Sequence, residues 1–307
     1  MDLAIQLEGV WKQFGKHTAV ADLSLAVPRG AVYGLLGPNG SGKTTSIRMI
    51  MGILLPDRGR VTLFGGDPDE PRRKRVGYLP EERGLYRKMK VEDVIVFLGE
   101  IRGVDAREAR RRARTWIDRL ELGAWAGKRV EDLSKGMQQK VQFIGTVVHE
   151  PELLILDEPF SGLDPINQDV LESIVLDYKQ KGTTILFSTH LMEQAERMCD
   201  AVCLISHSQK VLDGDLRSIK RAESRGVIAV EYEGSDDWIE RGSEVLSIER
   251  TRDDGVHLLL RDGADAQALL RRAVADHVVM HRFERVEPRL HEIFVKHAGR
   301  RGQEVVS

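Results

Sequence analysis

Apolar residues along the chain fall into short runs separated by helical patterns. Residues 3–11 and 19–27 alternate in part between apolar and polar positions, which is typical of strands with one covered face. A Pro-Arg-Gly turn at residues 28–30 follows the second strand. Runs typical of buried strands occur at residues 31–36, 153–156, 184–187 and 202–205. Because strands alternate with helical patterns, the order predicts a mostly parallel sheet covered by helices.

Two stretches of the first part of the chain have helical patterns. A glycine-rich segment at residues 37–42 precedes a helix that runs to Met51, and Gly52 predicts its end. Residues 91–121 predict a helical stretch that carries many charges.

The composition changes near residue 221. Strand patterns at residues 226–232, 256–260 and 278–283 surround one helix at residues 264–275. This order predicts a small α+β domain, and no motif in it indicates chemistry. We therefore expect two domains, residues 1–220 and residues 221–307.

The overall charge gives no reason to expect a nucleic acid or an anionic membrane as partner, because the net charge of the 307 residues is only -2. The longest apolar runs, residues 94–98 and 153–156, are far shorter than the roughly 20 residues that span a bilayer. The N-terminus also lacks the pattern of a signal peptide. We expect any membrane-spanning work to be done by a separate chain.

The cysteines and the basic segments favour ordinary structural roles. Cys199 and Cys203 are too few for a zinc site and predict two small buried residues in a reducing compartment. The basic stretches at residues 72–75 and 107–114 favour solvated faces. Nucleic-acid binding is the alternative, but no aromatic residues are interleaved with the charges. His277 and His281 lie in a strand-like run and do not predict a metal site.

Residues 37–44, Gly-Pro-Asn-Gly-Ser-Gly-Lys-Thr, fit the P-loop pattern G-x-x-x-x-G-K-[ST]. The glycines let backbone N–H groups point at phosphate oxygens, and the helix that follows presents its positive end to the same anion. Lys43 adds a charge for the β- and γ-phosphates, and Thr44 offers a hydroxyl to Mg²⁺. A glycine-rich turn that fits by accident is the alternative, and the strand before and helix after the motif disfavour it.

Asp157 and Glu158 end the apolar run Leu-Leu-Ile-Leu at residues 153–156. Ligands bind at this end of strands in open α/β sheets. Asp157 suits Mg²⁺, and Glu158 suits a general base for an attacking water. An acidic strand end without a role is the alternative if the run stands alone.

The segment Leu-Ser-Lys-Gly-Met-Gln-Gln-Lys at residues 133–140 predicts a helix start. Apolar residues at positions 141, 144 and 148 give the helix one apolar face. Ser134 is placed to cap this helix, with Gly136 beside it, which gives a second terminus suited to an anion. Alone, this is an ordinary helix cap.

Together these motifs resemble the ABC-type ATPases over roughly residues 3–220. Residues 37–44 match the family's Walker A motif, residues 133–140 its signature and residues 153–158 its Walker B motif. Residues 161–164, Ser-Gly-Leu-Asp, look like the D-loop, and His190 matches the switch histidine. Phe14 matches the aromatic residue that stacks on adenine. The resemblance implies a P-loop NTPase fold of the ABC type, with a mixed sheet, an antiparallel β part and a helical subdomain at about residues 88–150.

The resemblance also implies the cofactors and site residues. ATP and Mg²⁺ are the expected cofactors. Catalysis is expected from Lys43, Glu81, Glu158 and His190, and metal contact from Thr44, Glu81 and Asp157. Nucleotide contact is expected from Phe14, Gly37, Pro38, Asn39, Gly40, Ser41, Gly42, Lys43, Thr44, Thr45, Ser134 and Gly136.

Four positions depart from the common family pattern. Glu81 stands where the Q-loop usually has a glutamine that touches Mg²⁺ and bridges to the transmembrane partner. A carboxylate is also a hard oxygen ligand, so we expect metal contact to survive, and a solvent-facing Glu81 or a helix cap is the alternative. Lys135 and Met137 replace the usual Gly and Gln of the signature, and Phe160 replaces a usual Thr.

The segments Leu-Pro-Glu-Glu-Arg-Gly-Leu-Tyr (79–86), residues 133–140 and residues 287–299 resemble the ATPase subunits of bacterial sodium- and drug-efflux exporters. The resemblance implies an ATP-hydrolysing subunit that lies at the inner, cytoplasmic face of the cell membrane. Its expected partners are a separate transmembrane permease and a second ATPase subunit in a head-to-tail dimer, a homodimer by preference. A soluble ABC ATPase acting on nucleic acid or ribosomes is the alternative, but the chain has one P-loop and no zinc module. A protein that binds nucleotide without turnover is disfavoured by Glu158 and His190.

Overall fold

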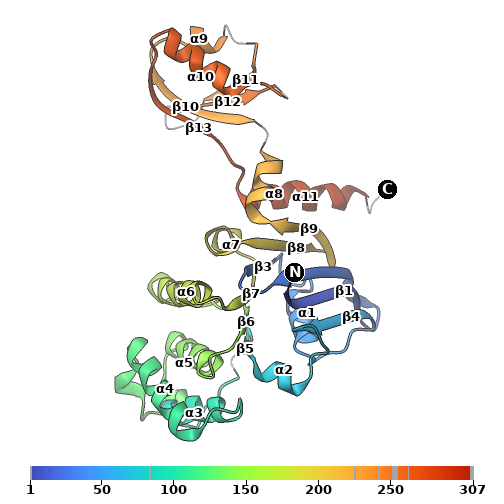
Figure 1. Ribbon diagram of the computed structural model, residues 1–307, viewed down its shortest axis with the longest axis vertical. Coiled ribbons are helices and arrows are strands. Elements are labelled where there is room, and N and C mark those ends of the chain that lie inside the picture. The colour runs from blue at the N-terminus through green and yellow to red at the C-terminus, as the bar shows by residue number, and fades with distance from the viewer. Residues whose placement is uncertain are drawn as a thin grey trace. The chain divides into compact units, whose positions relative to one another are not determined.

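The computed structural model describes residues 2–82, 84–224, 226–240, 243–250, 255–261 and 263–304 (Figure 1). The chain forms two compact units. The first runs to Leu216 and takes in the chain's end from Arg301, and the second comprises Arg217–Arg300. Residues 305–307, assigned above to the second domain, lie outside the described residues.

A six-stranded sheet forms the centre of the first unit. Its order is β5-β6-β7-β3-β8-β9, and every pairing is parallel except that of β8 with β9. The strands are β3 (Val32–Leu36), β5 (Val76–Leu79), β6 (Leu153–Asp157), β7 (Thr184–Thr189), β8 (Ala201–Ser206) and β9 (Gln209–Asp215). Every residue of β3, β6 and β7 is buried, as expected for parallel strands covered on both faces. The carboxyl ends of β3, β6 and β7 therefore meet at one edge.

A smaller antiparallel sheet with the order β2-β1-β4 packs on the first unit's core. Its strands are β1 (Leu3–Phe14), β2 (His17–Pro28) and β4 (Arg58–Leu63), and helix α1 spans Lys43–Ile50. One apolar cluster joins this sheet, α1 and the central sheet; its members include Ile5, Leu25, Leu63, Ile47, Leu35 and Ile155. The burial of α1 in this cluster fixes the position of the loop that precedes it.

Helices α3 (Val91–Glu100), α4 (Ala106–Arg119) and α5 (Lys135–Val147) gather beyond the β5 edge, together with the short 3₁₀ turns at Gly123–Trp125 and Val130–Asp132 (Figure 1). The helical stretch expected at residues 91–121 is divided. Gly103 adopts a left-handed φ of 92°, and the Asp105 side chain accepts bonds from the backbone N–H groups of Arg107 and Glu108. A glycine in this conformation followed by a capping aspartate starts a new helix.

The remaining helices of the first unit are α2 (Glu70–Lys74), α6 (Pro165–Gln180) and α7 (Met192–Met198). Asp164 caps α6 by accepting a bond from the Asn167 N–H, and Pro165 occupies the first helical turn, where its missing N–H costs nothing. Residues 161–164 thus lie in the connection between β6 and α6.

The second unit has its own antiparallel sheet, in the order β11-β12-β10-β13. Its strands are β10 (Val227–Glu233), β11 (Val245–Arg250), β12 (Val256–Leu260) and β13 (Val279–Arg285). The helices of this part of the chain are α8 (Leu216–Glu223), α9 (Asp237–Glu240), α10 (Ala266–Ala275) and α11 (Leu290–Glu304); Leu216 and the residues from Arg301 onward count with the first unit. A separate apolar cluster, with Ile228, Trp238, Leu258 and Leu269, packs this sheet against α9 and α10. The α/β fold class with an antiparallel β part, a helical part and a small α+β part is therefore confirmed.

Both cysteines are buried and free. Burial raises the pKa of the Cys199 thiol to about 12, and burial likewise raises that of Cys203. Neither thiol is therefore suited to act as a nucleophile. Among the described residues, no helix has the length and apolar character needed to cross a bilayer.

Candidate nucleotide-binding site

The loop at residues 37–42 connects the buried strand β3 to α1 and depends on two of its glycines. Gly37 has a φ of 151° and Gly42 a φ of 108°. A Cβ on Gly37 would lie 2.1 Å from the carbonyl oxygen of Ile205, and one on Gly42 would lie 2.4 Å from that of Ala19. Only glycine fits both the conformation and the space. The loop therefore curls in front of the α1 N-terminus, where backbone N–H groups can receive an anion.

Lys43, the first residue of α1, is 5% exposed and carries its ammonium group into the loop. Its Nζ donates to the carbonyl oxygens of Gly37 (2.8 Å) and Pro38 (3.2 Å). The same Nζ lies 3.5 Å from Oε1 of Glu158. The structure thus brings the P-loop lysine and the second carboxylate of β6 into one ion pair.

Asp157 and Glu158 end β6 next to the end of β7. The Ser188 hydroxyl donates to Oδ1 of Asp157 and accepts a bond from the Glu158 N–H at 3.2 Å. The other oxygen of Asp157 is buried and has no hydrogen-bond partner in the described part of the chain, and neither has the Ser41 hydroxyl. Buried polar atoms without partners are rare, and these two belong to the end of β6 and to the P-loop. Their chemistry suits a metal ion and phosphate oxygens.

Glu158 is held in an unusual conformation. Its φ of 48° lies in the left-handed region, which costs a non-glycine residue about 1 kcal/mol or more. His190, which follows β7, places Nδ1 3.0 Å from Oε2 of Glu158. Strain of this kind persists only where the surroundings hold it, and it gathers at functional sites. The loop after β6 therefore aims the Glu158 carboxylate between Lys43 and His190.

A pocket of about 420 Å³ opens in front of these groups. It is lined by Phe14, His17, Ala19, Asn39, Gly40, Gly42, Lys43, Thr44, Thr45, Glu81 and Glu158. The Phe14 ring is 49% exposed at the rim, with the Lys12 ammonium 5.7 Å from its centre. An exposed aromatic face at the mouth of a polar pocket suits a flat base.

Glu81 is exposed and contributes to the pocket wall. It follows β5, whose Tyr78 has its pKa raised to about 12 by burial, with the Asp157 carboxylate adding to the effect. The segment around Glu81 is held by Gln142 of α5, whose amide nitrogen donates to the carbonyl oxygens of Pro80 (3.3 Å) and Glu82 (3.2 Å).

Ser134 caps α5 by accepting a bond from the Met137 N–H at 3.3 Å. Neither Ser134 nor Gly136 lines the pocket that the P-loop lines. Phe160 is 3% exposed and packs edge-on against Phe187 at 5.6 Å, so its side chain serves packing. The structure therefore brings the P-loop, β6, Glu81 and His190 together, and leaves the helix start at Ser134 outside this cluster.

Four residues of this region were not predicted from the sequence. Ala19 and His17 enter the pocket from β2, which only the fold brings there. Ser188 could have been found from its place two residues before His190 at a predicted strand end. Gln142 lies within an ordinary helix pattern, and nothing in the sequence alone marks it.

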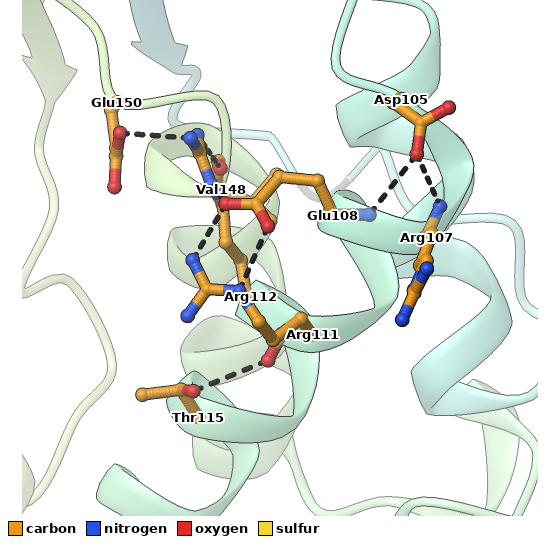
Figure 2. Close-up of polar contacts among 8 residues, drawn as sticks. All are labelled: Asp105, Arg107, Glu108, Arg111, Arg112, Thr115, Val148 and Glu150. Atoms are coloured by element: carbon orange, nitrogen blue, oxygen red, sulfur yellow. Dashed lines mark hydrogen bonds and ion pairs between the residues drawn. The ribbon is translucent and has the colours of Figure 1, made fainter.

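The basic stretch at residues 107–114 is largely paired with acids, as Figure 2 shows for α4. Glu108 binds both Arg111 (2.6 Å) and Arg112 (2.7 Å), and Arg112 also reaches Glu150 at 3.0 Å. These hydrogen bonds, the one from Arg111 first, hold the pKa of Glu108 at about 2. In the other stretch, Lys74 pairs with Glu70 and Arg75 with Glu152. This pairing favours the interpretation of solvated, salt-bridged faces.

A P-loop between β3 and α1, a histidine after the neighbouring strand β7 and two carboxylates at the end of β6, the strand beyond β7, define a P-loop nucleotide-binding protein. Comparison with known families narrows the class. Residues 20–161 match the ABC transporter family, and residues 214–298 match the C-terminal domain of DrrA1-3-like ATP-binding proteins.

Two curated proteins are similar to this chain over more than nine-tenths of its length. An uncharacterised ABC transporter ATP-binding protein, YhaQ of Bacillus subtilis (strain 168), is 40% identical over 295 residues, 96% of this chain and 98% of its own. Nod factor export ATP-binding protein I of Paraburkholderia xenovorans (strain LB400) is 33% identical and covers 91% of this chain and 96% of its own. A solved ATP-binding subunit of an ABC transporter has a TM-score of 0.67 at 31% identity and covers 71% of this chain and 92% of its own.

The chain therefore belongs to the ABC transporter family, as an ATP-binding subunit. These matches confirm the predicted family and its ATP-binding function. Members of this family are ATPases.

Proposed function

We propose that this chain hydrolyses ATP at the P-loop pocket and that hydrolysis powers export through a separate permease. The main support for hydrolysis is the placement of Glu158, a buried carboxylate that contacts both Lys43 and His190. Export is supported by the relatives named as Nod factor export ATP-binding proteins.

The residues present fit Mg²⁺ together with the phosphates of ATP. Thr44 lines the pocket, and Asp157 holds a buried oxygen without a partner among the described residues. No group of three or more His, Cys, Asp or Glu able to hold a metal occurs in the described part of the chain. This suits Mg²⁺, which is usually bound by one or two carboxylates plus phosphates and waters. When bound, Mg²⁺ neutralises charge on the phosphates.

Each remaining side chain has one task in this proposal. Lys43 exchanges its contact with Glu158 for phosphate oxygens, which carry more negative charge, and so frees Glu158 to accept a proton from water. His190 holds the γ-phosphate, and the backbone N–H groups of residues 39–45 receive the β-phosphate. Phe14 stacks on adenine. Glu81 faces the metal in place of the usual glutamine.

The test of hydrolysis is Glu158→Gln, which keeps the shape of the side chain and removes its basicity. Steady-state ATP hydrolysis should fall by about a hundredfold or more, since general-base catalysis contributes 10²–10⁴, while ATP still binds. Glu152→Gln is the matched control, because Glu152 precedes the other end of β6 and pairs with Arg75 at the surface. Unchanged hydrolysis in Glu158→Gln would refute the assignment of the base.

We infer a head-to-tail dimer from the position of the α5 start. Ser134 is exposed and does not line the pocket of its own chain, so its proposed nucleotide contact is made to a second copy. One chain carries both half-sites, which permits a homodimer. In the Glu158→Gln variant, ATP should convert monomer to dimer in analytical ultracentrifugation, and Ser134→Arg should abolish this conversion without loss of ATP binding. A Ser134→Arg variant that still dimerises would exclude this interface.

A groove on the first unit supports docking of the permease, which would hold this chain at the inner face of the membrane. The groove has a volume of about 350 Å³ and includes Ile53 and Ile101, which are 57% and 51% exposed. Arg73, Lys74 and Arg102 line it as well. Exposed apolar residues rimmed by charges are typical of protein-protein contacts. Ile53→Asp should abolish co-purification with the permease and leave basal hydrolysis unchanged; retained co-purification would exclude the groove.

A further inference from the structure

Helix α5 carries a buried polar stripe where its neighbours are apolar. Gln139, Gln142 and Thr146 lie one or two turns apart on one face of the helix, and they are 4%, 6% and 6% exposed. A buried polar side chain lowers stability unless it is hydrogen-bonded. The hydrogen bonds of these three side chains must therefore offset the cost of burying them.

All three side chains of the stripe donate to main-chain carbonyl oxygens rather than to each other. Gln139 Nε2 donates to the carbonyl oxygen of Pro159 at 3.1 Å, directly after Glu158. Thr146 Oγ1 donates to that of Tyr78 at 3.4 Å and to that of Gln142, one turn back, at 3.0 Å. The helix that begins at the signature thus reaches both segments that deliver carboxylates to the pocket.

Gln142 makes the most specific of these contacts. Its Nε2 donates to the carbonyl oxygens of Pro80 (3.3 Å) and Glu82 (3.2 Å), which flank Glu81 on both sides. The two bonds hold the carbonyl groups of the residues before and after Glu81, and so restrain the backbone from which the Glu81 side chain leaves. Both partners are acceptors, so the nitrogen of the amide must face them.

The oxygen of the same amide group is left without a hydrogen bond among the described residues, which lowers stability. Oε1 of Gln142 is buried and has no hydrogen-bond partner in the described part of the chain. An apolar side chain of equal length would fill the same space without an unpaired oxygen. A half-satisfied glutamine at this position is therefore poorly explained by packing and well explained by the two bonds that hold the Glu81 segment.

We propose that Gln142 is a positioning residue for Glu81. It ties the helix that begins at Ser134 to the wall of the pocket where Glu81 lies, so that a shift of α5 moves the Glu81 carboxylate relative to the metal. The inference rests on the proposed role of Glu81 as a metal-facing group.

The test compares Gln142→Met with Thr146→Val and Glu81→Ala. Methionine keeps the length and removes the donor. Thr146 lies one turn further along the same face and is equally buried, but its hydroxyl donates to the carbonyl oxygens of Tyr78 and Gln142 rather than to residues 80–82. All variants carry Glu158→Gln, so that hydrolysis does not interfere, and binding of a fluorescent ATP analogue is titrated with Mg²⁺.

Gln142→Met should shift the Mg²⁺ concentration for half-maximal binding by about threefold to tenfold in the direction of Glu81→Ala. Thr146→Val should shift it by less than twofold. Combined with Glu81→Ala, Gln142→Met should add no further shift, because the two residues act through one group.

Two failures are distinguishable. If Glu81→Ala shifts the titration and Gln142→Met does not, or if Gln142→Met lowers only the unfolding temperature, Gln142 is structural and the inference is wrong. If Glu81→Ala itself leaves the titration unchanged, the proposed role of Glu81 and the inference fall together.

Discussion

His149, just beyond the C-terminus of α5, is a buried histidine whose environment opposes its charge. Its Nε2 lies 3.2 Å from the carbonyl oxygen of Val76. Burial, and then the positive charge of Arg102, lower the pKa of the ring to about 4 from the usual 6.5. Above pH 6.5 the ring is neutral in both the folded and the unfolded chain. Between pH 6.5 and about 4 only the unfolded chain takes up the proton, so folding is weakened as the pH falls.

We expect His149→Gln to reduce the acid sensitivity of the first unit. The lowered pKa corresponds to about 3 kcal/mol of unfolding free energy lost between pH 6.5 and 4, and glutamine cannot be protonated there. Urea denaturation of the protein and the variant at several values in this pH range measures the difference. Curves of equal pH dependence would show that His149 is already able to bind a proton in the folded state.

Phe14 differs from His149 in being exposed, and its predicted contact with adenine can be tested. Its ring is 49% exposed at the pocket rim, and stacking on a base contributes about 1–3 kcal/mol. Phe14→Ala should therefore weaken ATP binding by about tenfold to a hundredfold, measured by calorimetry. Trp11→Ala is the control, because Trp11 pairs with Arg58 in the sheet and does not line the pocket. If Trp11→Ala weakens binding and Phe14→Ala does not, the wrong ring has been assigned.

At the scale of elements, the P-loop is shaped by the strand next to it as much as by its own residues. Gly37 and Gly40 both have positive φ angles, but only the Cβ of Gly37 would collide with a neighbour, the carbonyl oxygen of Ile205 at the end of β8. A Cβ on Gly40 would meet nothing within 4 Å. A substitution at Gly40 therefore tests the cost of the positive φ alone, whereas one at Gly37 adds the cost of the collision.

Gly37→Ala should destabilise the first unit by about 1–3 kcal/mol more than Gly40→Ala, because a collision with backbone adds to the cost of the positive φ. Denaturant unfolding of both variants gives the difference. Equal losses would show that β8 yields to the added methyl group, and that backbone conformation alone selects glycine.

At the scale of the whole molecule, the two units have separate apolar cores. One cluster joins the sheets and α1 of the first unit, and the other contains Trp238 and Leu258 of the second. All residues that line the nucleotide pocket belong to the first unit. The described residues of the second unit therefore contribute nothing to the lining of this pocket.

A chain that ends at Lys220 should fold and bind ATP with an affinity within about threefold of the full chain, since no pocket residue is removed. Calorimetry measures the affinity, and circular dichroism checks the fold. Lys43→Ala in the shortened chain is the control that should abolish binding. A folded but non-binding shortened chain would show that the second unit completes the site.

The elements that the sequence predicted well are those with strong local patterns. β3, β6, β7 and β8 appear where short apolar runs indicated buried strands. α1 ends at Ile50, one residue before the predicted end at Met51, and Gly52 follows with a positive φ of 62°. The helical stretch predicted at residues 91–121 is divided into α3 and α4, because the break at Gly103 depends on one glycine and one cap. β4 and β11 were missed, since half or more of each strand's residues are exposed and the apolar pattern is weak.

Sequence alone determined the class of protein, the P-loop and the carboxylates at the end of β6, because these features are local: a strand, a turn and a helix start lie together in the chain. Only the tertiary structure decided what lies beside them. Ser188 meets Asp157 across 31 residues and Gln142 holds the Glu81 segment across about 60. Such contacts depend on sheet order and helix packing, which no local pattern encodes. The positions of Lys43, Glu158 and His190 around one point follow from the same cause, the parallel alignment of β3, β6 and β7.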